Sequence, residues 1–166
     1  PISYSGCWGY VAPNGREYAI LGTYTGTAII DITDTSSIHE VAHITGPSSL
    51  WREMRTYKNR LYVVTEGGGG VQIINLSYLP DSAKLIRSFN YVSGAKNTLR
   101  VHSLQIFDGY LYLNGCANWG TQSQRGTLIF SLAVPDTPAF CSEYSPNYFH
   151  DCYVKNDTLY GASIYS

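Results

Sequence analysis

The sequence has 166 residues, of which 44% are hydrophobic and only 14% are charged, against roughly 25% charged residues in an average soluble domain. The formal net charge of −1 gives no electrostatic basis for binding nucleic acid or an anionic membrane surface. No stretch approaches the roughly 20 apolar residues that a membrane-spanning helix needs, so we expect no membrane span.

The first part of the chain contains four short runs rich in β-branched and aromatic residues, at 7–11, 18–23, 28–32 and 39–44. Each run is too short for an ordinary helix and is bounded by turn residues, which predicts consecutive antiparallel strands. Residues 1–6 precede the first run, and we expect them to form a linker or an outer strand of another sheet.

The stretch 51–76 repeats this pattern most clearly, with runs at 51–57, 61–65 and 71–76 and a fourth run at 84–89. Gly67–Gly70 allow the chain to reverse, since glycine accepts positive φ. Because these glycines precede a strand and not a helix, they predict no phosphate site.

The third unit has runs at 101–106, 111–114 and 140–144 and a run that begins at Gly126. An expanded loop that carries Trp119 precedes Gly126, and it is predicted to be either a contact surface or a long hairpin that caps a neighbouring unit. Only two further runs follow, at 149–155 and 158–163.

The units share internal landmarks. Tyrosines recur in the second run at spacings of 44, 50 and 48 residues, at Tyr18, Tyr62, Tyr112 and Tyr160. The third run recurs as GTAIIDI, GVQIINL and GTLIFSL. Four strands in a unit of roughly 45 residues are typical of a β-propeller blade. We therefore predict an all-β, partial β-propeller in one domain over residues 1–166, with blade one at 7–45, blade two at 50–90, blade three at 101–145 and partial blade four at 149–166.

Two strands of the fourth blade are missing from this pattern, and residues 1–5 would replace only one. Neighbouring blades cover each other's apolar faces, and a closed ring needs about four or more of them. We expect further chain or another subunit to complete the fold. A closed four-bladed ring is the alternative.

Five segments, in this order along the chain, resemble segments of a known family: GREYA from Gly15, GTAIIDITD from Gly26, SLWREM from Ser49, VHS from Val101 and FHDC from Phe149. They are similar to the secreted choice-of-anchor B propellers, which are built from LVIVD-type repeats. The resemblance implies an extracellular, secreted or cell-surface bacterial repeat protein. It implies no particular activity.

A large ring begins each unit, at Trp8, Trp51, His102 and His150. The first strand of a propeller blade lines the central channel, so these rings are predicted to meet near one mouth, beside Arg52, Glu53, Ser103 and Asp151. The candidate catalytic residues are Glu53, His102, His150 and Asp151. The candidate binding residues are Trp8, Trp51, Arg52, His102, Trp119 and His150. Alternatively, a ring that recurs in each repeat locks neighbouring blades together.

These features favour a binding or structural module for an extracellular protein or glycan, because a fold alone does not imply chemistry. The alternative is a hydrolase or lyase with a polar site at the mouth. No cofactor is predicted, although a metal ion held by His102, His150 and Asp151 is an open alternative without a local ligand motif.

The four cysteines, Cys7, Cys116, Cys141 and Cys152, lack the CxxC spacing of zinc or redox sites. An even number in a secreted protein predicts disulfides. Cys141 with Cys152 is one reasonable pair, and Cys116 with Cys141 is its competitor.

Overall fold

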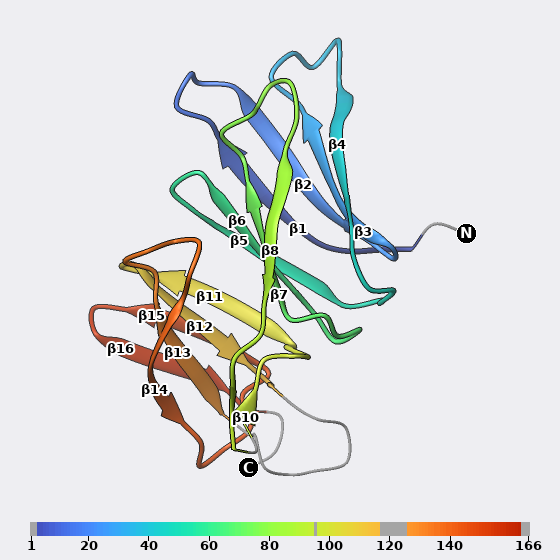
Figure 1. Cartoon of the computed structure of the whole chain (residues 1–166). Coiled ribbons are helices and arrows are strands. Elements are labelled where there is room, and N and C mark those ends of the chain that lie inside the picture. The colour runs from blue at the N-terminus through green and yellow to red at the C-terminus, as the bar shows by residue number, and fades with distance from the viewer. Residues whose placement is uncertain (1–2, 95, 117–125, 164–166) are drawn as a thin grey trace.

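The computed structural model describes residues 3–94, 96–116 and 126–163. These residues form three four-stranded antiparallel sheets and two two-stranded hairpins, which follow one another in chain order (Figure 1). The predicted all-β class with four-stranded antiparallel sheets is confirmed. Within the described residues, no helix is long and apolar enough to cross a membrane.

Each four-stranded sheet is a meander in which every strand pairs with the next one along the chain. The first sheet contains β1 (Tyr4–Val11), β2 (Glu17–Thr23), β3 (Gly26–Asp31) and β4 (His39–Thr45). The second contains β5 (Arg52–Tyr57), β6 (Arg60–Thr65), β7 (Val71–Asn75) and β8 (Lys84–Phe89). The third contains β11 (Ser103–Phe107), β12 (Tyr110–Asn114), β13 (Thr127–Ser131) and β14 (Ala139–Tyr144). The last hairpin contains β15 (Asp151–Lys155) and β16 (Thr158–Ala162).

Two segments differ from the prediction. Tyr4–Gly6 belong to β1 itself, so this part of the predicted 1–6 segment extends the first sheet, and Pro1 and Ile2 lie outside the described residues. The crossover after β8 contains an unpredicted hairpin, β9 (Val92–Ser93) and β10 (Lys96–Asn97). Strands of two residues carry too little periodicity to be recognised in a sequence.

The tight turns between first and second strands explain several polar residues. Asp108 and Gly109 have φ values of 45° and 75°, and Asn156 and Asp157 have values of 48° and 60°. A two-residue hairpin that matches the strand twist needs positive φ at both central positions, and Asn, Asp and Gly tolerate it best. These turns lie in the gaps between the runs predicted at 101–106 and 111–114 and at 149–155 and 158–163.

The third strand of each four-stranded sheet begins beside a glycine for a steric reason. A Cβ on Gly26, Gly70 or Gly126 would overlap the carbonyl oxygen of Ile44, Phe89 or Tyr144, respectively. These carbonyls lie at the end of the fourth strand or just beside it. The repeated glycine therefore lets the fourth strand lie against the start of the third.

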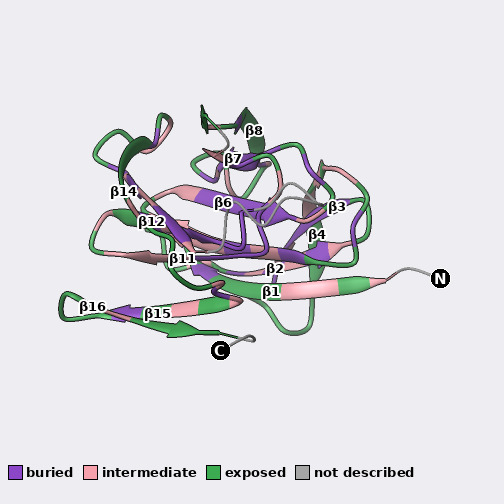
Figure 2. Ribbon diagram, turned by 90° about the horizontal axis from the view of Figure 1, so that it is seen from below, coloured by how far each residue is buried: buried purple, intermediate pink, exposed green. Residues whose placement is uncertain are grey.

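Two apolar cores join consecutive sheets. One contains Ile20 and Ile29 of the first sheet together with Met54 and Leu61 of the second. The other packs Tyr62 and Ile73 against residues of the third sheet such as Phe130. Inner strands are largely buried while the outer strands β8, β14 and β16 are mostly exposed (Figure 2).

Candidate functional site

The first strands of consecutive sheets lie side by side and run in the same direction. Ser5 Oγ donates to Arg52 O at 3.3 Å, and Trp8 Nε1 donates to Thr56 Oγ1 at 3.0 Å. Trp8 lies further along β1 than Ser5, and Thr56 lies further along β5 than Arg52, so β1 and β5 are parallel. Val101 N, just before β11, donates to Thr65 O, and Thr65 pairs with Arg52 at the start of β5. Ser103 Oγ, at the start of β11, donates to His150 O just before β15. The starts of β5, β11 and β15 therefore lie at one end of the molecule.

Two histidines meet at this end. His102 Nε2 lies 2.6 Å from His150 Nε2, across 48 residues of sequence. Their ring centroids are 3.9 Å apart, and the ring planes are inclined by 59°. The structure thus brings together two of the four rings that the sequence predicted to converge.

A carboxylate holds the other nitrogen of each ring. His102 Nδ1 lies 2.6 Å from Glu66 Oε1, and His150 Nδ1 lies 2.7 Å from Asp151 Oδ2. The four side chains form one continuous chain of contacts, which we call the Glu66–Asp151 chain. His102 is almost buried, with 8% exposure, whereas the side chains of His150 and Asp151 are 38% and 58% exposed.

The two carboxylates determine where the ring protons lie. An ionised carboxylate only accepts hydrogen bonds, so each Nδ1 must carry the hydrogen that it donates. A neutral imidazole has one N–H, so both Nε2 atoms then present lone pairs to one another. A contact of 2.6 Å between two lone pairs is repulsive unless a positive species lies between them. The geometry therefore defines a site for a cation, either a shared proton or a metal ion.

The backbone at both histidines is fixed by the neighbouring strand. His102 N donates to Asn114 O at 3.0 Å, and His150 N donates to Ala162 O at 2.9 Å. Ser103 Oγ donates to His150 O at 2.6 Å, which ties the third sheet to the last hairpin. The position of the pair is thus set by strand pairing and not by side chains alone.

A buried polar network lies directly behind Ser103. Asn114 Nδ2 donates to Ser103 Oγ at 3.1 Å, and Thr127 Oγ1 donates to Asn114 Oδ1 at 2.6 Å. All three residues are buried. Buried polar groups that satisfy one another hold a single geometry, so this network makes the start of β11 rigid.

Glu66 was not among the candidates from sequence, and Glu53 was. Glu66 follows β6 and lies 36 residues before His102, in a different sheet. Glu53 instead lies 3.7 Å from Arg55 Nη1 and takes no part in the histidine contacts described here. The sequence feature that could have identified Glu66 is its position just after β6, the second strand of its sheet, and just before Gly67. That end lies beside the start of the next sheet, since Val101 N donates to Thr65 O at 3.3 Å.

Strand pairing separates the two tryptophans from the histidines. In each sheet, the repeated tyrosine of the second strand pairs with one residue of the first strand: Tyr10, Arg55, Gln105 and Tyr153 in turn. The equivalent positions three residues before these partners are Cys7, Arg52, His102 and His150. Trp8 lies one residue later than this place and Trp51 one residue earlier. Side chains alternate between the faces of a strand, so neither ring joins the histidine pair.

Arg52 takes the histidine place in the second sheet but is fully buried. Its Nε donates to Thr23 O at 3.2 Å, and its Nη2 donates to Pro47 O at 2.6 Å. Burial lowers the pKa of this guanidinium. Arg52 therefore joins the first and second sheets and is not accessible to a partner.

The tryptophans have different surroundings. The Arg55 guanidinium lies 4.3 Å from the Trp8 ring centroid, an arrangement that covers one ring face. Trp51 is 53% exposed beside Leu50, which is 51% exposed, at the same end as the histidines. Trp119 lies outside the described residues. Trp51 is thus the candidate binding tryptophan that the structure leaves open.

The predicted disulfides are not formed. Cys7, Cys116, Cys141 and Cys152 are all free thiols. Cys116 is buried, with its Sγ 3.6 Å from Leu113 O, whereas Cys141 is exposed on an outer strand. The proposed pair of Cys116 and Cys141 is therefore wrong because β13 separates the inner and outer positions. The proposed pair of Cys141 and Cys152 is also wrong, because Cys152 Sγ lies beside β12, where it accepts from Asn114 Nδ2 at 3.4 Å, whereas Cys141 lies on the outer strand β14.

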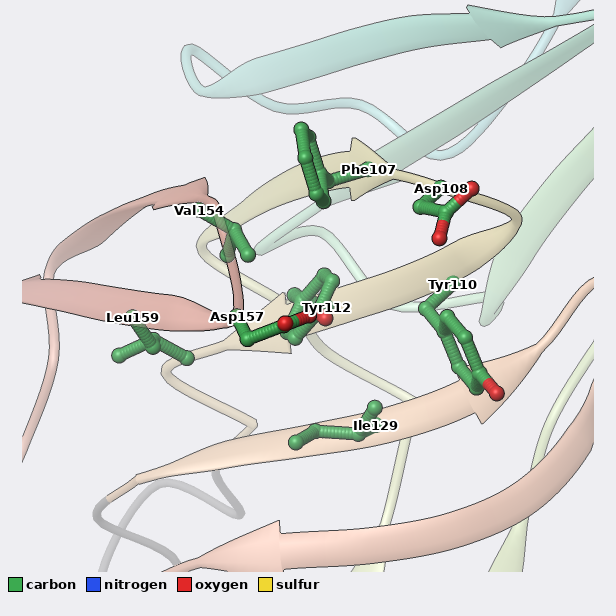
Figure 3. A pocket seen from close by; sticks show the side chains of 8 residues that line it. All are labelled: Phe107, Asp108, Tyr110, Tyr112, Ile129, Val154, Asp157 and Leu159. Carbon is green, nitrogen blue, oxygen red and sulfur yellow. The ribbon is translucent and has the colours of Figure 1, made fainter.

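An apolar groove of about 270 Å³ lies elsewhere, between the third sheet and the last hairpin (Figure 3). Tyr110, Tyr112 and Ile129 contribute one wall, and Val154 and Leu159 contribute the other. The last hairpin has two strands where the third sheet has four, so it covers the third sheet only in part. This groove contains none of the residues of the Glu66–Asp151 chain.

No protein-family model matches the chain, and no curated protein matches it at a significant level.

Proposed function

We propose that the sheets are consecutive blades of a β-propeller, and that this propeller is an extracellular or cell-surface binding module. The first strands β1, β5, β11 and β15, each in contact with the next, support the blade arrangement, because the first strands of the blades surround the axis of a propeller. The extracellular location rests on the resemblance to choice-of-anchor B proteins with LVIVD-type repeats. The four free thiols lend it no support.

The single observation that supports a binding site is the gathering of functional groups at one end of the sheets. The Glu66–Asp151 chain lies there with the exposed Leu50 and Trp51. A rigid aromatic side chain beside polar groups is typical of contact surfaces in complexes. We assign this end to an extracellular protein or glycan partner.

A binding assay with matched variants tests this assignment. Fluorescently labelled protein is applied to a glycan array and to intact cells, as wild type, Trp51→Ala and Tyr110→Ala. Tyr110 is also exposed, at 42%, but begins β12 opposite Phe107, at the far end of the third sheet's first hairpin. We expect binding that Trp51→Ala weakens at least tenfold and that Tyr110→Ala leaves unchanged. The absence of any bound glycan or cell, or equal binding by both variants, contradicts the assignment.

A hydrolase or lyase is the second candidate, because a histidine pair between two carboxylates is suited to moving protons. Glu66 takes the place that Glu53 held in this hypothesis. The test is turnover of ester and glycoside substrate panels by wild type and His150→Asn. Turnover that disappears in a folded His150→Asn protein supports catalysis, and turnover that persists excludes this site.

We also propose that further strands cover the last hairpin, from continuing chain or another subunit. Tyr18 and Tyr62 are buried beneath the following sheet, whereas Tyr160 is 59% exposed. Exposed strand edges recruit partners. Light scattering on the 166-residue chain is expected to show association, and a monodisperse, stable monomer contradicts this.

A further inference from the structure

The strongest unexplained feature is the contact between two histidine nitrogens that both carry lone pairs. The 2.6 Å separation of the Nε2 atoms of His102 and His150 is close even for a hydrogen bond. Both Nδ1 atoms are already engaged with Glu66 and Asp151. A cation between the Nε2 atoms removes the repulsion.

We propose that His102 Nε2 and His150 Nε2 bind one divalent transition-metal ion of the Zn²⁺ class. Neutral imidazole is a preferred ligand for Zn²⁺, Cu²⁺ and Ni²⁺, whereas Mg²⁺ and Ca²⁺ prefer oxygen ligands. Only the Nε2 atoms are available as imidazole ligands, because the Nδ1 atoms hold hydrogens. The ion would therefore lie where the two rings meet.

The carboxylates have the arrangement that metal-binding histidines use. A ligating histidine commonly donates its other N–H to a carboxylate, which fixes the tautomer and makes the ligating nitrogen more basic. Glu66 does this for His102 at 2.6 Å, and Asp151 does it for His150 at 2.7 Å. Their two negative charges also favour a divalent ion over an empty site.

The required movement is small. Two nitrogens bound to one tetrahedral Zn²⁺ lie about 3.3 Å apart, given Zn–N distances of about 2.0–2.1 Å. The observed pair must therefore open by less than about 1 Å. His150 lies just before β15 of a two-stranded hairpin, and its side chain is more exposed than that of His102, so it can make this adjustment.

Two protein ligands leave coordination positions for water or a partner. Within the described residues, no group of three or more His, Cys, Asp or Glu side chains is arranged to hold one ion. The remaining positions are then free for water, which a partner's oxygen or nitrogen atom can replace. A metal site here deepens the binding function proposed above and rests on it for the role of the ion, but metal binding can be measured alone.

Calorimetry with Zn²⁺ and the metal-free protein tests the site, and the four histidines of the chain supply matched variants. We expect one Zn²⁺ per chain, with affinity reduced at least tenfold in His150→Asn and about tenfold in Glu66→Gln. The double variant His39→Asn with His43→Asn removes the other two histidines and is expected to bind as wild type does. Mg²⁺ is expected not to compete.

A second readout covers a variant that fails to fold. Co²⁺ bound to wild-type protein is expected to show visible d–d absorption that changes when Zn²⁺ displaces it. Failure of wild type to bind Zn²⁺ or Co²⁺ overturns the metal site and leaves a shared proton as the cation. Full binding by His150→Asn, or loss of binding in the His39 and His43 double variant, overturns it as well. Neither result bears on glycan or cell binding, so the two proposals fail separately.

Discussion

Gly26→Ala is expected to destabilise the protein through one close approach. An alanine Cβ at this position would overlap Ile44 O, and it would lie 2.8 Å from the His43 ring. Inserting a methyl group into a packed site costs about 1–3 kcal/mol. Displacing β4 also weakens its pairing with the start of β3, at about 1 kcal/mol for each hydrogen bond lost.

One opposing effect reduces this cost. Replacing glycine by alanine limits the unfolded chain, which stabilises the folded state by about 0.4–1 kcal/mol. The net loss in the free energy of unfolding is therefore about 2–3 kcal/mol, or a fall in Tm of about 5–10 °C for a chain of this size. Urea denaturation and thermal melts measure both quantities.

Gly9→Ala is the matched control in the same sheet. A Cβ on Gly9 meets no atom within 4 Å, so this variant is expected to be as stable as wild type or slightly more stable. If Gly26→Ala has the stability of Gly9→Ala, the recurring glycine does not serve the approach of the fourth strand. The steric explanation of the repeat would then be wrong.

Three further predictions concern buried groups. Tyr62→Phe removes the hydrogen bond from Tyr62 Oη to Pro135 O at 2.8 Å and should lower the free energy of unfolding, measured with urea, by about 1 kcal/mol. Tyr160 is exposed, so Tyr160→Phe should leave the free energy of unfolding unchanged. Equal effects of the two variants would contradict the role of this hydrogen bond in joining the second and third sheets. Hydrogen bonds from Thr33 and Arg16 lower the pKa of Asp31 to about 2, below its unfolded value of about 3.9, so the stability it contributes is complete above about pH 4 and is lost as the pH falls towards 2. Asp31→Asn should reduce this acid dependence of the urea midpoint, and an unchanged dependence would show that other carboxylates cause it. Burial raises the pKa of the Cys116 thiol to about 12, so little reactive thiolate forms at neutral pH. Iodoacetamide should therefore modify the exposed thiols of Cys7 and Cys141 in the folded protein, and that of Cys116 only after unfolding. Modification of Cys116 in the folded protein, or a mass that shows a disulfide, would contradict the structure.

The regular strands could be predicted because each repeat carries the same local signals. Alternating apolar runs and turn residues such as Asp108-Gly109 are properties of neighbouring residues, and they located the four-stranded units. The hairpin at Val92–Asn97 was missed because its strands have only two residues each. The disulfides were predicted wrongly because cysteine number says nothing about which thiols face each other.

The candidate site could be predicted only in part. His102 and His150 were recognised from their repeated position, and the contact between them follows from the parallel first strands. The tryptophans were placed one residue out of register, and a shift of one residue moves a side chain to the other face. Glu66 was missed because its contact joins the end of one sheet to the start of the next.

Nitrogen-15 NMR of the histidine rings, in metal-free protein at neutral pH, shows which ring nitrogens carry hydrogen. If the carboxylates of Glu66 and Asp151 hold hydrogens on both Nδ1 atoms, the two Nε2 atoms face a common cation. The spectrum is expected to show Nδ1–H on both rings, and the Nε2 signals of both rings should shift together when Zn²⁺ is added. A bare Nδ1 on either His102 or His150, with its hydrogen on Nε2, would contradict the account.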